Sequence, residues 1–424
     1  MGNGPAGSYR AGGRGPTRPW TCTVRPASEL LWRTRSSTAD AGGGWVGSML
    51  DKHPALELEG ATASLLEQYG FDRHTFERLR AQLQQLGTTG FDNRVRGKVE
   101  APRAGELIEL PPAGSQEHER LTLLGADALR GGQVGHVVLA GGMATRFGGA
   151  VKAAVDALPG HTFLDLKLDG ARALARSHET AIPVYLMTSF ATDAAVRAAA
   201  ETLQDPAAPV RTFPQFVSLR VTETGDLFLT RDGKPSPYAP GHGDLTFALR
   251  RSGVLHDFRA GGGRVLFMSN VDNLGATLDA TLIGAHLDGG RPITAEVTER
   301  RQDDKGGAPA RVDGQLQILE EFRFPGSFDP ARIPVFNTNT FAFDAQAIDR
   351  DFDLSWFCVR KKVSGATAIQ FERLVGQLTA FLPCRFVSVP REGSASRFEP
   401  VKDPAELQRR RSQIGSLLKA RGVV

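Results

Sequence analysis

Along most of the chain, short apolar runs alternate with stretches whose apolar residues recur every three or four positions. Short apolar runs bounded by turn residues are typical of buried strands, and the recurring pattern is typical of amphipathic helices. From residue 136 onward the predicted strands are 136–140, 163–168, 183–187, 265–268, 293–297, 316–319, 340–343 and 385–389. The predicted helices are 171–177, 193–203, 245–252, 278–287, 367–378 and 404–418. This alternation predicts an α/β domain with a doubly wound, mostly parallel sheet and helices on both faces.

The segment before the first of these strands has a different pattern, which predicts helices. Apolar residues recur at helical spacing from Phe76 to Leu86, and Gly87 follows as a stop signal. Residues 117–129 form a second stretch of this kind. We therefore expect residues 49–133 to be a helical N-terminal region that packs as a cap against the α/β domain.

The net positive charge of the chain comes from its first 48 residues. The net charge is +4, and residues 1–48 contain six arginines but only two acidic residues. Their Gly, Pro, Ser and Arg content without an apolar period predicts a disordered tail, or a mis-assigned translation start with the true one near Met49. The remainder of the chain is formally neutral, which argues against nucleic-acid binding.

The composition also argues against a membrane protein or a disulfide-rich secreted one. Hydrophobic residues make up 41% of the chain, but no apolar run approaches the ~20 residues of a membrane span. The three cysteines, Cys22, Cys358 and Cys384, have neither metal-ligand spacing nor the even number of a disulfide framework. A cytoplasmic location is the simplest for such a chain, because the cytoplasm keeps thiols reduced.

The stretch from Val137 to Lys152 carries the strongest functional signal. Its sequence, V-V-L-A-G-G-M-A-T-R-F-G-G-A-V-K, places a glycine-rich loop directly after the first predicted strand. Glycines let backbone N–H groups approach an anion, and Arg146 and Lys152 add positive charge. The spacing fits neither a Walker loop nor a dinucleotide fingerprint. The loop is therefore either a polyphosphate site or a tight strand-to-helix turn with two solvated cations.

Two further polar motifs suit ligand binding, and the second follows the predicted strand 265–268 directly, at the carboxyl end where such sheets bind ligands. P-G-H-G-D at 240–244 has glycines that allow a base or sugar to approach, a neutral His242 able to hydrogen-bond, and Asp244 as a possible helix N-cap. S-N-V-D-N-L-G-A at 269–276 has one carboxylate, Asp272. Because Mg²⁺ at phosphates typically uses one or two protein carboxylates, Asp272 is the predicted metal ligand, with a turn former as the alternative.

Two more motifs are ambiguous when taken alone. F-N-T-N-T at 336–340 presents three neutral polar side chains, which suit sugar hydroxyls but also an ordinary turn. R-F-E-P-V-K-D at 397–403 carries Lys402, and a lone lysine is usually a solvated surface charge.

In their order and spacing these motifs resemble the UTP–glucose-1-phosphate uridylyltransferase (UDP-glucose pyrophosphorylase) family. The resemblance runs from about 137 to 403 and also includes M-T-S-F at 187–190, Gln215 in F-P-Q, E-V-T at 296–298, K-G-G at 305–307 and L-E at 319–320. It implies a Rossmann-like fold of nucleotidyltransferase type A. It also implies a catalytic domain over 134–390 and a C-terminal segment, 391–424, that carries the Lys402 motif.

The activity that the resemblance implies is synthesis of UDP-glucose and pyrophosphate from UTP and glucose 1-phosphate. Glucose 1-phosphate would attack the α-phosphorus in line, reversibly and with Mg²⁺, and Asp272 would bind the metal. The implied catalytic residues are Lys152, Lys402 and Arg146. The implied nucleotide-binding residues are Leu139, Ala140, Gly141, Gly142, Gln215 and Gly241. The implied sugar-phosphate-binding residues are His242, Asn270, Val271, Glu320, Asn337, Thr338 and Asn339.

The chain departs from the family pattern at three places. Ala144 stands where the family usually has glycine, and Val151 stands where proline commonly precedes the lysine. Longer members continue into a C-terminal β-helix that contributes to oligomerisation. This chain ends at Val424, so we expect no β-helix and leave the oligomeric state open.

Two alternatives to this function stay open. One is a related pyrophosphorylase for galactose 1-phosphate or N-acetylglucosamine 1-phosphate, although P-G-H-G-D favours glucose-type members over the G-N-G-G of N-acetylglucosamine enzymes. The other is a non-catalytic UDP-sugar-binding protein, against which the retained lysines and Asp272 argue.

Overall fold

A computed structural model describes residues 60–144, 147–302, 304 and 306–424 of the chain. These residues all belong to one compact unit. The predicted tail, 1–48, and the candidate catalytic Arg146 lie outside the described residues. No helix in the described ranges is long and apolar enough to span a bilayer.

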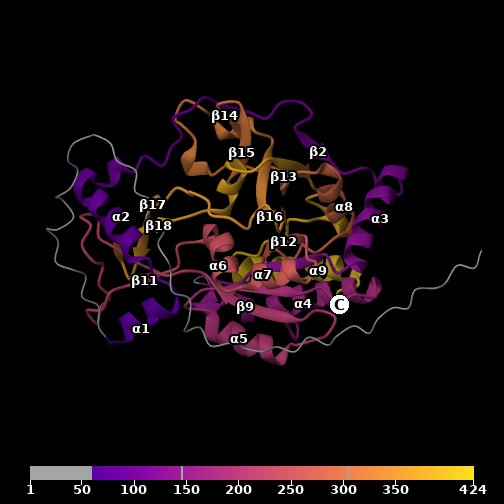
Figure 1. The fold of residues 1–424 in the computed structure, drawn as a ribbon, viewed down its shortest axis with the longest axis horizontal. Helices are drawn as coiled ribbons and strands as arrows, with labels where there is room; N and C mark the ends of the chain where they lie inside the picture. Colours follow the sequence, from indigo (N-terminus) through magenta and orange to yellow (C-terminus); the bar gives the residue numbers. More distant parts are fainter. Residues whose placement is uncertain (1–59, 145–146, 303, 305) are drawn as a thin grey trace, which may run out of the picture. The chain divides into compact units, whose positions relative to one another are not determined.

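An eight-stranded sheet lies at the centre of this unit (Figure 1). Its strands, in spatial order, are β2 (Leu107–Glu109), β19 (Cys384–Ser388), β13 (Ile293–Glu299), β16 (Val335–Asp344), β12 (Val265–Asn270), β3 (Val134–Leu139), β8 (Val184–Thr188) and β9 (Val210–Pro214). All neighbouring pairs are parallel except those of β16, which runs antiparallel to both β12 and β13. The predicted mostly parallel sheet is confirmed, with one reversed strand near its middle.

Helices cover both faces of the sheet, as predicted. Successive side chains of a strand point to opposite faces. Val137 of β3 packs with α6 (Leu245–Arg251) and α7 (Val254–Ala260), whereas its neighbour Val138 packs with α4 (Phe163–Ser177) and α5 (Asp193–Thr202). The C-terminal helix α9 (Pro404–Ala420) packs on the same side as α4 and α5 through apolar residues such as Ile414. Two further helices, α3 (Gln116–Arg130) and α8 (Ala280–Gly289), pack closely against each other.

Two of the predicted elements are wrong. The predicted strand 163–168 is the beginning of α4, where the Thr162 and Asp165 side chains form a capping box. Nearly every residue in that first part of the helix is buried, so its sequence has the continuous apolar character of a strand. The predicted helix 367–378 is instead β18 (Ala366–Glu372) followed by a 3₁₀ helix, η8 (Val375–Ala380). Pairing with β17 (Phe357–Val363) stabilises the strand there.

The N-terminal region is not only helical, contrary to the prediction. It does begin with α1 (Gly60–Gln68) and α2 (Arg73–Leu86), and α2 buries Phe76 and ends where Gly87 donates its N–H to Leu83. However, β2 joins the central sheet, and β1 (Val99–Glu100) pairs with β14 (Ala308–Val312). The predicted strand 316–319 lies in β15 (Gln315–Leu319), which completes this small sheet beside the central one. The remaining short strands are β4 (Met143–Ala144), β5 (Ala150–Val151), β6 (Asp156–Leu158), β7 (His161–Thr162), β10 (Ser218–Leu219) and β11 (Pro237–Tyr238).

Candidate active site

The glycine-rich loop leaves the carboxyl end of β3 and folds back as a small hairpin. Its two arms are β4 and β5, which pair antiparallel, and the Lys152 N–H donates to the Gly142 carbonyl at 3.3 Å. Leu139 ends β3, and the N–H of buried Ala140 donates to Met187 at the end of β8. The hairpin therefore brings Lys152 back to the edge of the sheet at which β3 and β8 end.

Gly141 lies against a buried amide at this edge. The Ser189 hydroxyl donates to the Gly141 carbonyl at 2.8 Å. A Cβ on Gly141 would come within 2.3 Å of the Gln215 Nε2 atom, so glycine leaves the space that this amide occupies. Within the described residues, Gln215 Oε1 is buried and has no hydrogen-bond partner. A buried acceptor without a partner costs free energy, so a donor on a ligand would satisfy it.

The P-G-H-G-D loop is fixed by Arg373 at the end of β18. Gly241 has φ +108°, and a Cβ there would lie 2.8 Å from the Arg373 carbonyl, so only glycine fits. Asp244 stands at the N-cap position of α6, as the sequence allowed, but its side chain makes no capping hydrogen bond. Instead it accepts from Arg373 Nε at 3.0 Å and from the Phe216 N–H at 3.1 Å. Asp244 thereby connects this loop to the residue next to Gln215.

His242 is held as a neutral imidazole. Its Nδ1 accepts a hydrogen bond from the Val375 N–H at 3.0 Å, and burial lowers its pKa to about 4. A neutral ring that accepts at Nδ1 carries its proton on Nε2. His242 can therefore donate one hydrogen bond to a phosphate or hydroxyl oxygen.

Lys152 is buried rather than solvated, contrary to the alternative of two solvated cations. Only 7% of the residue is exposed, and its ammonium lies 4.2 Å from the centre of the Phe147 ring. The Nζ atom donates to the carbonyl of Val401 and lies 3.9 Å from Asp272 Oδ2. These contacts place the predicted catalytic lysine beside the predicted metal ligand.

Asp272 follows the end of β12, and its side chain keeps 29% of its surface exposed. Burial raises the pKa of its carboxyl group, and the ammonium groups of Lys152 and Lys167 oppose that shift. Its backbone carbonyl accepts from the Val401 N–H at 3.3 Å. Within the described ranges, no cluster of three or more His, Cys, Asp or Glu side chains could hold a metal. One accessible carboxylate is nonetheless a sufficient protein contribution for Mg²⁺ bridging substrate phosphates.

Lys402 comes directly after Val401, at the start of α9. Its side chain is exposed, and its backbone N–H donates to Glu406 Oε2 at 2.7 Å. The pKa of Asp304 is lowered, against the effect of burial, by hydrogen bonds from Arg391 and the Arg301 N–H, and the charge of Lys402 adds a smaller contribution. The structure thus brings the backbone of this segment to Asp272 and Lys152, whereas no described hydrogen bond or ion pair joins the Lys402 side chain to Asp272.

The F-N-T-N motif lies in a bulge of β16. Glu296 of β13 pairs with Thr340 but the next residue pairs with Asn337, so Thr338 and Asn339 are extra residues in the ladder. Asn339 has φ +56° and donates from Nδ2 to Asn270 Oδ1 at 3.0 Å. A bulge of this kind redirects side chains. Here it joins two predicted sugar-phosphate residues.

The other predicted sugar-phosphate residues lie around this pair. The Thr338 hydroxyl donates to the Glu296 carbonyl at 2.9 Å within the sheet, and the N–H of buried Val271 donates to Leu139. Glu320 follows β15, and burial raises its pKa to about 7. Its carboxylate lies 3.0 Å from a Cβ built on Gly307, whose carbonyl accepts from the N–H of buried Asn337.

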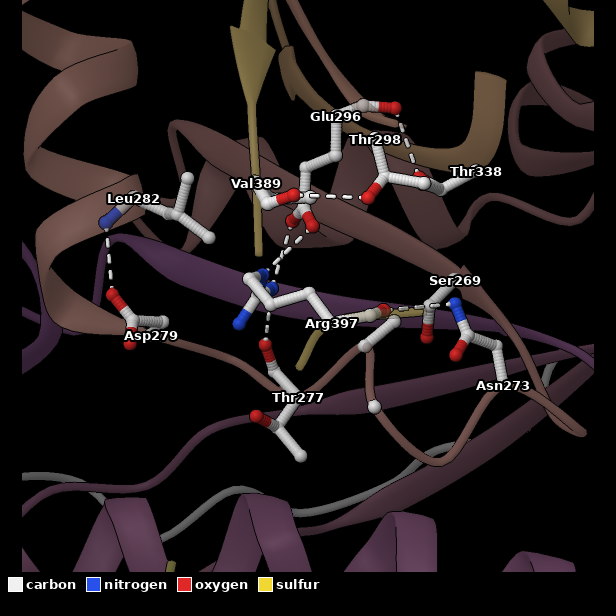
Figure 2. Close-up of polar contacts among 12 residues, drawn as sticks. Ser269, Asn273, Thr277, Asp279, Leu282, Glu296, Thr298, Thr338, Val389 and Arg397 are labelled. Carbon is white, nitrogen blue, oxygen red and sulfur yellow. Dashed lines mark hydrogen bonds and ion pairs between the residues drawn. The ribbon is translucent and has the colours of Figure 1, made fainter. Parts of the chain in front are cut away.

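A buried ion pair beneath this edge was not predicted. Arg397 is 5% exposed and donates to both carboxylate oxygens of Glu296 at 2.7 Å, and also to the Thr277 carbonyl (Figure 2). The Asn273 side chain donates to the Arg397 carbonyl at 3.2 Å and accepts from the Glu399 N–H at 2.8 Å. Glu296 lies in the E-V-T motif and Arg397 in the R-F-E-P-V-K motif. These two motifs were the sequence signal that could have pointed to the ion pair.

Comparisons with known proteins relate this chain to one enzyme family. Residues 98–421 match the model of the family described as UTP–glucose-1-phosphate uridylyltransferase. The enzyme of that name from Encephalitozoon cuniculi is 30% identical over 284 residues, which are 63% of this chain and 56% of the relative. UTP–glucose-1-phosphate uridylyltransferase 2 from Dictyostelium discoideum is 30% identical over 300 residues, which are 66% of this chain and 59% of the relative. The chain therefore spans less than two thirds of the length of these relatives.

A solved structure supports the fold. The UDP-glucose phosphorylase of Trypanosoma brucei superposes with a TM-score of 0.67 at 24% identity, over 83% of this chain and 79% of that one. The family match covers all the predicted site residues, from the glycine-rich loop to Lys402. This chain belongs to the UTP–glucose-1-phosphate uridylyltransferase family.

Proposed function

We propose that this chain catalyses the reversible formation of UDP-glucose and pyrophosphate from UTP and glucose 1-phosphate. The observation that carries the proposal is the meeting of Lys152, Asp272 and the Val401 backbone beside the glycine-rich loop. A cation, a carboxylate and exposed loop backbone at the carboxyl edge of a sheet suit a nucleoside triphosphate.

In this proposal the substrate supplies the nucleophile. A phosphate oxygen of glucose 1-phosphate attacks the α-phosphorus of UTP in line, and pyrophosphate leaves. The protein contributes positioning and charge stabilisation. Lys152 would neutralise the triphosphate from the loop side, and Lys402 would approach from the C-terminal segment. Arg146, which lies outside the described residues, would add a further positive charge. Asp272 would hold Mg²⁺, which when bound screens charge between the phosphates.

The nucleotide pocket is assigned from the loop and two neighbouring groups. The backbone from Leu139 to Gly142 would face the ribose and base, with Gly241 on the other side of the uracil. Gln215 Oε1 is an acceptor, and uracil carries an N3–H donor. Cytosine and adenine carry a lone pair at the corresponding ring position, so this contact favours UTP.

The sugar-phosphate pocket is assigned to polar groups across the sheet edge. His242 would donate to the phosphate from Nε2. Asn270 and Asn339, already joined to each other, would contact the phosphate and hydroxyls together with Val271, Asn337 and Thr338. Glu320, with its pKa raised to about 7, is half-protonated near neutral pH and could donate to or accept from a sugar hydroxyl.

A pyrophosphate-release assay with UTP and a panel of sugar 1-phosphates tests the proposal. We expect turnover with glucose 1-phosphate to exceed that with galactose 1-phosphate and N-acetylglucosamine 1-phosphate. A higher rate with either of the others would select that sugar as the substrate. Tight UDP-glucose binding by calorimetry with no turnover of any sugar 1-phosphate would make the chain a binding protein instead.

Several broader features also stay proposals. They are the division into residues 49–133, 134–390 and 391–424, a capping role for α1 and α2, and a cytoplasmic location without nucleic-acid or membrane partners. Cys358 and Cys384, the two cysteines in the described ranges, are both free, which agrees with a reducing compartment.

A further inference from the structure

Lys167 is a buried lysine to which the proposed chemistry gives no role. It lies in α4, directly after the capped first turn, and only 3% of the residue is exposed. Burying an ammonium group costs several kcal/mol unless hydrogen bonds replace its hydration. A lysine in such a position therefore needs a compensating set of acceptors.

Those acceptors all belong to the loop that carries Asn270 and Asp272. Lys167 Nζ donates to Ser269 Oγ at 3.1 Å, to the Asn273 carbonyl at 2.6 Å and to the Ala276 carbonyl at 2.7 Å. An ammonium group has three donors, and all three are used here. The three contacts span residues 269–276, so they fix the loop at its beginning, middle and end.

The C-terminal segment also holds this loop. The Asn273 side chain bonds the backbone of Arg397 and Glu399, and the Asp272 carbonyl accepts from the Val401 N–H. The loop is thus held both by Lys167 and by residues 397–401. Figure 2 shows the hydrogen bond from the Asn273 side chain to the Arg397 carbonyl.

The charged groups around Lys167 act in both directions on its ammonium. Burial is the largest effect and disfavours the charged form of Lys167, and Arg397 and Arg421 add to it. Asp272 and Glu296 favour the charged form. From β3, the His136 ring shares the Ser269 hydroxyl at 3.1 Å, and burial keeps that ring neutral. No described carboxylate forms an ion pair with Lys167, so its hydrogen bonds to the loop are the contacts that compensate its burial.

We propose that Lys167 is a positioning residue that holds the 269–276 loop, and through it the Asn270 and Asp272 side chains, in the arrangement that receives substrate phosphates. Without the ammonium, the carbonyls of Asn273 and Ala276 lose their buried donor, and the loop samples open conformations. The part of this proposal that concerns catalysis rests on the proposed function. The part that concerns loop order does not.

Hydrogen exchange tests the loop without turnover. In Lys167→Met, which keeps the length and apolar stem of the side chain, we expect amides of residues 270–277 to exchange on the order of 10-fold or more faster. The matched control is Leu129→Ala, a cavity variant in α3 whose side chain packs in the apolar cluster beside α4 and which has no described hydrogen bond to residues 269–276. Equal exchange of the loop in these two variants would overturn the proposal.

A second set of variants covers a failure of Lys167→Met to fold. Ser269→Ala removes one of the three acceptors, and Lys167→Arg keeps a cation that can reach the same carbonyls. We expect exchange of the loop to rise moderately in Ser269→Ala and to stay nearer the wild-type rate in Lys167→Arg. Two results together would contradict the proposal. The first is loop exchange in Ser269→Ala that is as slow as in the wild type. The second is loop exchange in Lys167→Arg that is no closer to the wild-type rate than in Lys167→Met, or a Lys167→Arg variant that also fails to fold.

Kinetics and metal binding separate positioning from general stability. In Lys167→Met we expect kcat to fall by about 10- to 100-fold and the Mn²⁺ dissociation constant, measured by spin resonance with UTP bound, to rise about 10-fold. Leu129→Ala should lower the melting temperature but keep wild-type values of both. Wild-type kcat and Mn²⁺ affinity in Lys167→Met would refute the catalytic part. A wild-type protein that turns over no sugar 1-phosphate would refute the proposed function, while the exchange experiment would still decide whether Lys167 orders the loop.

Discussion

The ammonium of Lys152 donates to the backbone carbonyl of Val401, across 249 positions of sequence. This contact joins the glycine-rich loop to the C-terminal segment directly before Lys402. The Val401 N–H also bonds the carbonyl of Asp272. One short piece of backbone thus aligns three segments that contribute to the candidate phosphate site, and removing Lys152 has structural as well as chemical consequences.

The two candidate catalytic lysines should therefore behave differently when replaced by alanine. Lys152→Ala should lower kcat by on the order of 10²–10³ through lost charge stabilisation. It should also lower the free energy of unfolding by about 1–3 kcal/mol, because the Val401 carbonyl loses its donor. Lys402→Ala should lower kcat by a similar factor with little change in melting temperature, because its side chain is exposed.

Pyrophosphate-release kinetics and thermal denaturation check both variants. Lys234→Ala is a matched control, because the Lys234 side chain is 71% exposed and its described ion pair is with Asp232, which is not a predicted site residue. A wild-type kcat in Lys402→Ala would make that residue a surface charge. An unchanged melting temperature in Lys152→Ala would show that its bond to Val401 contributes nothing to stability.

Base selection should depend on Gln215. Sites that hydrogen-bond a substrate group reject analogues lacking it by large factors, so we expect kcat/KM for UTP to exceed that for ATP by on the order of 10⁴. Gln215→Ala should lower kcat/KM for UTP and leave the slow reaction with ATP nearly unchanged, so the preference narrows. Gln204→Ala, at an exposed glutamine whose Nε2 donates to the Val210 carbonyl, is a control outside the pocket. Comparable turnover of UTP and ATP by the wild-type chain would refute the uridine assignment.

The stability of the protein in acid should depend on His242. Its pKa is about 4 in the folded state against 6.5 when unfolded, so between these values the unfolded chain binds more protons. The contribution of the neutral ring is therefore complete above pH 6.5 and is lost as the pH falls toward 4, by about 3 kcal/mol at most. His242→Gln does not titrate and keeps an acceptor for the Val375 N–H.

Chemical unfolding at pH 7, 5.5 and 4.5 measures this difference. The free energy of unfolding should fall more steeply with acid in the wild type than in His242→Gln. His286 also has a pKa lowered to about 4, but it is present in both proteins and cancels. Parallel dependences on pH would mean that His242 is not buried as a neutral ring.

The Glu296–Arg397 pair should be costly to break from one side. Arg397→Met leaves a buried carboxylate without its partner, and such changes cost about 3–5 kcal/mol. Replacing both residues, as Glu296→Met with Arg397→Met, should recover part of this loss, because no unpaired charge remains. Denaturant unfolding of the two single variants and the double variant gives the coupling energy. Additive losses in the double variant would show that the two side chains do not stabilise each other.

The sequence pattern predicted the features that depend on residues close together in the chain. The apolar run of β3 and the glycines behind it predicted a strand followed by a loop, and helical spacing predicted α2, α3, α5 and α9 closely. Alternation of these elements predicted a mostly parallel sheet, because parallel strands need helical crossovers. The order of the motifs along the chain also predicted the family, because it matches the order of the motifs in the family.

Only the tertiary structure decided how these pieces meet, because contacts between distant residues depend on strand order and register. The start of α4 reads as a strand until it is packed, since a helix buried on nearly all sides has no polar face. The bulge that turns Asn339 toward Asn270 exists only because β16 pairs with β13. In the same way, nothing local distinguishes Lys152 and Lys167 from solvated lysines. Each donates its hydrogen bonds to a loop or segment that lies more than 100 residues later in the sequence.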